Sequence, residues 1–197
     1  MFEFLVYSRK GRTDGGFRSL REGGRLEVVH QCAVMALFRS HAHRRDVVFH
    51  AILGGPPRPP VHLRIDGQDL RDTRTDERSW EAILRKVLEG GAHPGISVSR
   101  ESLQEFVKRR HEEGCEIFVL EERGRSILDC TFSEPALFVV GDQVGLPRKE
   151  EKFILRFAEK ISLGKQRYLS ASCIDIVNFF LDNQPLLKGG GSPPQGF

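Results

Sequence analysis

The chain has 197 residues, 39% of them hydrophobic and 29% charged, with a formal net charge of +3. This balance is ordinary for a folded domain with one sizeable core, and it excludes a membrane-embedded chain and a strongly basic nucleic-acid-binding tail. We therefore expect a single domain over residues 1–188, a disordered Gly/Pro-rich tail over 189–197, and, since no signal peptide or membrane span is recognisable, a cytoplasmic protein without membrane partners.

The first part of the chain predicts strands and helices in alternation. Apolar runs indicate strands at 3–8, 46–53 and 61–65, and apolar residues at helical spacing indicate helices at about 25–40, 76–89 and 100–113. Trp80 falls on the apolar face of the second helix, so we expect it in the core. The proline-rich segment 54–60 reads as a rigid turn between two strands.

The second part of the chain predicts buried parallel strands. Residues 115–120 (CEIFVL) and 136–140 (ALFVV) are short, continuous apolar runs, as in strands that are covered on both faces. Helices that alternate with such strands indicate an α/β fold with a mostly parallel sheet. A last helix at about 171–183 is apolar nearly all round, which predicts burial against the sheet on one side and a second subunit on another. Its polar stripe would be Asp175, Asn178 and Asp182.

Three turn signatures follow apolar stretches in this second part. They are 120–124 (LEERG), 141–146 (GDQVGL) and 161–164 (ISLG), the last leading to Cys173. Ligands of open α/β sheets settle beyond the carboxyl ends of the strands, and Gly141 would let backbone approach a ligand closely. One Gly-Asp pair is also typical of a plain turn, but three loops in this order favour a shared site.

These loops resemble the S-adenosylmethionine site of the SPOUT methyltransferases. The strings at 43–49 (HRRDVVF), 55–60 (GPPRPP) and 138–142 (FVVGD) are similar to the archaeal tRNA (pseudouridine-N1)-methyltransferases within that superfamily, over nearly the whole chain except the tail. The resemblance implies a SPOUT fold with a deep trefoil knot at about 115–188, a homodimer formed through the C-terminal helix region, and S-adenosylmethionine as methyl donor. It also implies N1-methylation of pseudouridine 54 in the T-loop of tRNA.

The same resemblance implies the residues of the site. Methyl transfer requires that the N1–H proton of pseudouridine be lost, and Asp46 is the carboxylate that the motif offers, with Arg44 beside it. Nearby cations stabilise a carboxylate, so we expect Asp46 to orient the base more than to store its proton. The other assignments are Arg39, His43, Arg45 and Arg58 for RNA binding, and Leu120, Gly141, Asp142, Gly145, Leu146, Ile161, Ser162, Leu163, Leu169 and Cys173 for cofactor binding.

The charge distribution is compatible with RNA. Residues 1–50 carry nine Lys and Arg against five Asp and Glu, whereas residues 51–197 carry 21 against 22. We therefore expect the positive field on the N-terminal part, where it would attract a phosphate backbone. A solvated, salt-bridged surface explains arginines equally well, and a surface ion-pair cluster is the ordinary fate of an Arg-Arg-Asp triplet.

Several alternatives are weighed from the residues. A Rossmann-type enzyme is disfavoured because no G-x-G-x-x-G follows the first strand, and ribose methylation is disfavoured because Asn178 and Asn183 are the only asparagines. Two alternatives stay open: an rRNA pseudouridine N1-methyltransferase, which typically has proline where Arg45 stands, and a non-catalytic RNA-binding module on the same scaffold. No metal is expected, since His41 and His43 lack a suitably spaced third ligand. Cys173 reads as a wall of the pocket and not as a nucleophile.

Overall fold

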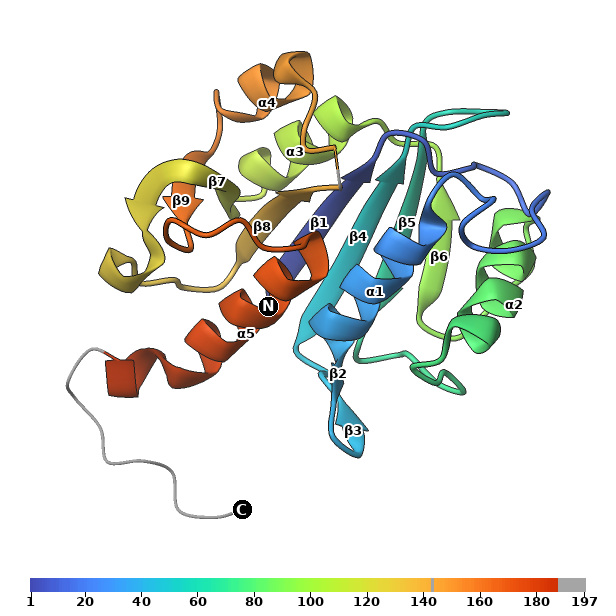
Figure 1. The fold of residues 1–197 in the computed structure, drawn as a ribbon, viewed down its shortest axis with the longest axis horizontal. Helices are drawn as coiled ribbons and strands as arrows, with labels where there is room; N and C mark the ends of the chain where they lie inside the picture. The colour runs from blue at the N-terminus through green and yellow to red at the C-terminus, as the bar shows by residue number, and fades with distance from the viewer. Residues whose placement is uncertain (143, 188–197) are drawn as a thin grey trace.

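The structure is a computed structural model and describes residues 1–142 and 144–187, so the predicted disordered tail lies outside the described residues. Within the described residues, seven strands form one sheet in the order β6-β5-β4-β1-β8-β7-β9 (Figure 1). The strands are β1 (Phe2–Ser8), β4 (Val47–Leu53), β5 (Val61–Asp66), β6 (Ile96–Ser99), β7 (Glu116–Ser126), β8 (Ala136–Gly141) and β9 (Glu159–Ser162).

The sheet is mostly parallel, as the sequence predicts. β1 pairs in parallel with β4 and β8, β7 pairs in parallel with β8 and β9, and β5 runs antiparallel to its two neighbours. All seven residues of β4 are buried, which explains why its sequence is apolar except for His50. A small hairpin of β2 (Phe38–Arg39) and β3 (Ala42–His43) precedes β4.

Helices cover both faces of the sheet (Figure 1). The helices α1 (Leu26–Leu37), α2 (Glu77–Leu88) and α5 (Ser170–Leu187) share one apolar core, and α3 (Leu103–Glu112) and α4 (Arg148–Ile154) pack on the other. Trp80 on α2 is 1% exposed, and its indole Nε1 donates a hydrogen bond to the Arg74 carbonyl at 2.7 Å. Its predicted core position is confirmed.

Several short elements escape the sequence prediction, and one predicted loop is wrong. The β2–β3 hairpin is one of them, because the helix expected to about residue 40 ends at Leu37. Two others are β6 and α4. β6 carries serines on an exposed edge, and α4 is a short, highly charged helix, so neither shows a clear apolar period. The 120–124 signature lies inside β7, which continues to Ser126 after an irregularity between Leu120 and Arg125. Gly124 permits this, because a Cβ there would stand 2.7 Å from the backbone nitrogen of Ile161 on β9.

Helix α5 is buried on one side and exposed on another. Ile174, Val177 and Phe180 are covered by the core, whereas Phe179 is 62% exposed. Asn178 was expected on a polar stripe, but it is buried, and its amide donates to the Met35 carbonyl near the end of α1 at 2.9 Å. This correction arises because α1 ends against α5 and leaves carbonyl groups that need a donor. The segment before β8 also contacts α5, since the Phe132 N–H donates to the Gln184 side chain at 2.9 Å. Threading of the chain through a knot stays a prediction.

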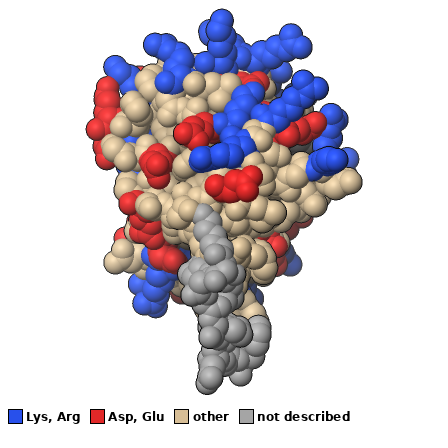
Figure 2. Space-filling model, turned by 90° about the vertical axis from the view of Figure 1, so that its left-hand side faces the viewer, with Lys and Arg blue, Asp and Glu red and all other residues tan. Residues whose placement is uncertain are grey.

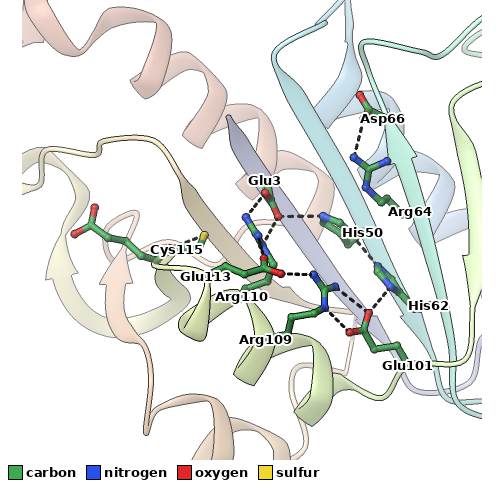
Figure 3. Close-up of polar contacts among 11 residues, drawn as sticks. Glu3, His50, His62, Arg64, Asp66, Glu101, Arg109, Arg110, Glu113 and Cys115 are labelled. Carbon is green, nitrogen blue, oxygen red and sulfur yellow. Dashed lines mark hydrogen bonds and ion pairs between the residues drawn. The ribbon is translucent and has the colours of Figure 1, made fainter.

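A polar cluster with a buried centre at Glu3, His50 and His62 joins the sheet to α3 (Figure 3). We call it the histidine network; it consists of Glu3, His50, His62, Glu101, Arg109 and Arg110. Glu3 contacts His50 at 3.1 Å, His50 contacts His62 at 2.9 Å, and the second nitrogen of His62 lies 2.9 Å from Glu101. Arg110 pairs with Glu3 and Arg109 pairs with Glu101, so each carboxylate has an arginine partner from α3. The network ties β1, β4 and β5 to one helix.

Candidate active site

A cavity of about 610 Å³ opens at the carboxyl ends of β8 and β9, beside the irregularity in β7. Its floor comes from Leu120 at that irregularity and from Val140 and Gly141 at the end of β8. Its sides come from α1, the first turn of α5 and the two loops that follow β8 and β9. Parallel strands ending at one edge place these distant segments together. The cavity therefore lies where the three sequence signatures predict a ligand site.

Eight of the ten predicted cofactor residues line this cavity. They are Leu120, Gly141, Asp142, Gly145, Leu146, Leu163, Leu169 and Cys173. Ile161 is instead fully buried in the core, and Ser162 stands behind the wall. The Ser162 hydroxyl donates to the Glu122 carbonyl at 3.1 Å and accepts from the Gly164 N–H at 3.1 Å. Ser162 thus holds two wall segments together and does not face the cavity.

The loop after β8 is shaped by Gly141 and Asp142. A Cβ at Gly141 would stand 2.7 Å from the Gly145 Cα, so the glycine lets the loop fold back on itself. The Asp142 carboxylate accepts from the N–H of Val144 at 2.8 Å and from the N–H of Arg9 at 3.2 Å. Both residues therefore build the turn, and their presence in the wall follows from that role.

The predicted catalytic and RNA-binding residues lie elsewhere. Arg39, His43, Arg44, Arg45 and Asp46 gather before the first residue of β4, whereas Arg58 lies in the loop after β4. The start of β4 pairs through Phe2 with the start of β8, so this cluster is at the amino end of the parallel strands. A seven-residue strand spans roughly 20 Å. Within one chain, Asp46 therefore lies at the amino ends of the parallel strands and the cavity lies at their carboxyl ends.

Arg44 is not free to bind phosphate in this structure. It is 8% exposed, and its guanidinium forms a two-pronged ion pair with Asp182 on α5, with one N···O distance of 2.7 Å. Hydrogen bonding to Asp182, opposed by burial, raises the pKa of Arg44 above its already high ordinary value. Arg44 thus anchors α5. Its sequence neighbourhood could not disclose a partner 138 residues away.

Asp46 is open to solvent. Its side chain is 59% exposed, and its ion pair with Arg39 is loose at 3.8 Å. Arg45 is exposed as well, and it makes no ion pair within residues 1–142 and 144–187. The half-buried His43 has a buried Nε2 atom without a hydrogen-bond partner in the described part of the chain. An exposed carboxylate with adjacent cations can contact a ligand brought from outside the chain.

The comparisons with known proteins agree with this architecture. A family model described as "Putative SAM-dependent RNA methyltransferase" matches residues 1–186. A Methanococcus maripaludis C5 protein named tRNA (pseudouridine(54)-N(1))-methyltransferase is 33% identical over 196 residues, covering 92% of this chain and 98% of its own length. A Methanocella arvoryzae protein of the same name is 34% identical, covering 93% of this chain and all of its own length.

The chain belongs to this family of RNA methyltransferases. Among solved structures, Archaeoglobus fulgidus Nep1 bound to S-adenosylhomocysteine superposes with a TM-score of 0.64 at 15% identity, covering 92% of this chain and 96% of that chain. This likeness shows the fold, which is that of the SPOUT methyltransferases. The fold class predicted from the sequence is confirmed.

Membership of the family directs attention to wall residues that the sequence assignment omits. Glu121 lines the cavity; its burial, and next the nearby Glu151, raise the pKa of its carboxyl group. Tyr168 and Ser170 bracket the predicted Leu169, and Gln31 comes from α1. Glu121 lies within the 120–124 signature, and Tyr168 and Ser170 lie between the 161–164 signature and Cys173, so these three residues could have been assigned from the sequence. Gln31 has no such signal, because only packing brings α1 to this edge.

The chemistry of the wall argues against a thiol nucleophile. Burial raises the pKa of Cys173, which keeps its thiol protonated at neutral pH. In the described residues, no group of three or more His, Cys, Asp and Glu side chains is arranged to hold a metal ion. A search of the same residues for a helix long and apolar enough to span a membrane also finds none.

Proposed function

We propose that this chain transfers the methyl group of S-adenosylmethionine to N1 of pseudouridine 54 in the T-loop of tRNA. The observation that carries the proposal is the cavity built by the ends of β7, β8 and β9 in a chain of this family. Relatives at 33% and 34% identity, matched over more than nine-tenths of this chain, bear the name of that activity. An enzyme that acts on tRNA fits a cytoplasmic location.

The residues of the cavity fit the methyl donor. A volume of about 610 Å³ is within the range of small-molecule sites, about 300–1,000 Å³. Leu120, Leu146 and Leu169 supply apolar wall for a flat adenine ring, and backbone is accessible at Gly145. The carboxylate of Glu121 supplies negative charge at the same wall, which suits a ligand with ammonium and sulfonium groups, whereas the Glu122 carboxylate is paired with Arg167.

The bound donor supplies an electrophilic methyl group on a positively charged sulfur. N1 of pseudouridine would take that methyl group, S-adenosylhomocysteine would be the leaving group, and the N1–H proton would pass to bulk water beside the exposed Asp46 carboxylate. The protein's part is to align the two reactants and to exclude competing geometries. Asp46 accepts a hydrogen bond from N1–H, which orients the base and favours loss of the proton. The exposed side chain of Asp46 is free to make that contact.

A homodimer brings Asp46 of one copy close to the cavity of the other copy. One chain places Asp46 roughly 20 Å from its own cavity, as the length of β4 requires. The outer side of α5 and the cavity rim expose apolar side chains, with Phe179 at 62% and Leu169 at 74%. Such a surface is suited to a second copy. The first turn of α5 lines the cavity, and Asp182 near its other end pairs with Arg44, two residues before Asp46. If two copies pack with their α5 helices antiparallel about a two-fold axis, Asp46 of one copy lies toward the cavity of the other.

The activity is tested by methylation of short RNA hairpins. We expect transfer to a tRNA T-arm with pseudouridine at position 54, and none to the same hairpin with uridine, detected by mass spectrometry of the nucleosides. Faster transfer to an rRNA hairpin containing pseudouridine would identify the rRNA enzyme instead. Tight binding of both hairpins without turnover would identify a non-catalytic RNA-binding module.

The dimer is tested by mixing two inactive variants. Asp46→Asn removes the base-orienting carboxylate, and Cys173→Trp fills the cavity of its own chain. In mixed dimers one of the two sites is intact, so we expect activity to return on mixing. Activity that stays absent, although both variants unfold at the wild-type temperature and exchange subunits, would mean that the site is not shared between copies.

A further inference from the structure

Basic side chains gather on one side of the molecule, over α4 and the loops beside it. Figure 2 shows Lys and Arg spread over the upper part of this face, with acidic side chains set among them. Five exposed cations define what we call the basic surface: Arg123, Arg148, Lys149, Lys152 and Lys165. None of the five makes an ion pair within residues 1–142 and 144–187.

Several acids of the same region are already engaged by other side chains. Glu151 pairs with Lys160, Glu159 pairs with Arg125, and Glu122 pairs with Arg167. The Glu150 carboxylate accepts a hydrogen bond from the Gln104 side chain on α3. Helix α4 thus turns its glutamates toward neighbouring elements. Its Arg and Lys side chains remain on the outer side, uncompensated.

The basic surface borders the mouth of the cavity. Helix α4 begins two residues after Leu146, Lys165 stands between Gly164 and Gln166, and Arg123 follows Glu122. All four of these neighbours line the cavity. A polyanion drawn to the basic surface is therefore held beside the cavity opening.

We propose that the basic surface binds backbone phosphates of the RNA whose base is modified at the cavity, an inference that rests on the proposed function. Uncompensated lysines and arginines on an exposed helix make sequence-independent contacts with phosphate and release counterions. They position the RNA without reading its bases. A linear charge count conceals the surface, because it does not show that Glu122, Glu151 and Glu159, acids of the same region, are paired with other side chains in the fold.

The test uses a triple variant of α4, Arg148→Gln, Lys149→Gln and Lys152→Gln, in the full chain. The matched control removes three exposed cations on and before α2, by Arg74→Gln, Arg78→Gln and Lys86→Gln. The dissociation constant of a T-arm hairpin is measured across a salt series without S-adenosylmethionine. Each phosphate contact contributes about 0.7 to 0.9 to the slope of log affinity against log salt, so we expect the slope to fall by about 2 in the α4 variant only.

Turnover separates this inference from the proposed function. We expect the α4 variant to raise KM for RNA about tenfold or more, with kcat at saturating RNA and the affinity for S-adenosylmethionine unchanged. An unchanged salt slope, or an equal fall in the α2 control, would overturn the basic surface even if pseudouridine is methylated normally. A smaller slope confined to the α4 variant would support the surface even if neither hairpin is methylated.

Discussion

The two faces of the sheet treat buried polar groups in opposite ways. Beneath α3, the histidine network closes on itself, and each of its carboxylates is met by a histidine and an arginine (Figure 3). At the cavity, wall groups such as the Glu121 carboxylate face open space. The polar cluster that is satisfied by its own chain holds β1, β4, β5 and α3 together, whereas the wall groups that face open space are available to a ligand.

The largest effect on stability is expected from a substitution in the histidine network. Glu3→Gln removes the charge that pairs with Arg110 and contacts His50. Loss of one partner of a buried ion pair costs about 3 to 5 kcal/mol, so we expect a fall of that order in the free energy of unfolding. Urea denaturation measures it.

Glu22→Gln is the control, because Glu22 is exposed; its change should stay within about 0.5 kcal/mol. Affinity for S-adenosylmethionine should be preserved in folded Glu3→Gln protein. A cost as small as that of the control would mean that the network contributes little to the fold.

The free energy of unfolding should fall at acidic pH because of the histidine network. Burial, and next the charge of His50, lower the pKa of His62 from 6.5 to about 4, and burial lowers the pKa of His50. Between pH 6.5 and 4 the unfolded chain then binds more protons than the folded one, so stability is lost as pH falls through this window. For His62 the loss amounts to about 3 kcal/mol.

Glu3 adds a further loss below pH 4.5. Its burial opposes ionisation, but contacts from His50 and Arg110 outweigh burial and lower its pKa. The unfolded carboxyl therefore takes up its proton first. Denaturant titrations from pH 7 to 4 on wild type and His62→Gln provide the check, since the variant should lose much of the dependence above pH 4.5. Equal slopes in the two proteins would contradict the assignment to His62.

The smallest expected effect is on the open side. Ser162→Ala removes the hydroxyl that joins the Glu122 carbonyl to the Gly164 N–H behind the cavity wall. We expect a stability loss of about 1 kcal/mol, together with a fewfold weaker affinity for S-adenosylmethionine because the wall segments lose their link. Calorimetry with the cofactor measures the affinity, and Ser99→Ala on exposed β6 should change neither quantity. A large stability loss without a change in affinity would place Ser162 with the closed side.

Much of the fold could be predicted because its strands and amphipathic helices carry their own pattern. The strand β4 is fully buried and apolar at six of its seven residues, and α2 presents one apolar face with Trp80 in the core. Elements without such a pattern could not be predicted. Helix α4 has seven residues and is largely charged, and β6 is an edge strand with serines. Their conformation depends on neighbours that the local sequence does not reveal.

The sequence by itself determined the kind of site. Turn chemistry at Gly141 and Gly145 is encoded locally, and parallel strands bring their carboxyl ends together, so most of the residues that the family resemblance assigned to the cofactor line one cavity. Tertiary structure alone decided which charges are available. Arg44 forms an ion pair with Asp182, and Asn178 is buried against α1. In α4, Glu151 pairs with Lys160, whereas Arg148, Lys149 and Lys152 make no ion pair in the described part of the chain. Ion pairs between residues far apart in the chain depend on the packed geometry, and no local pattern specifies them.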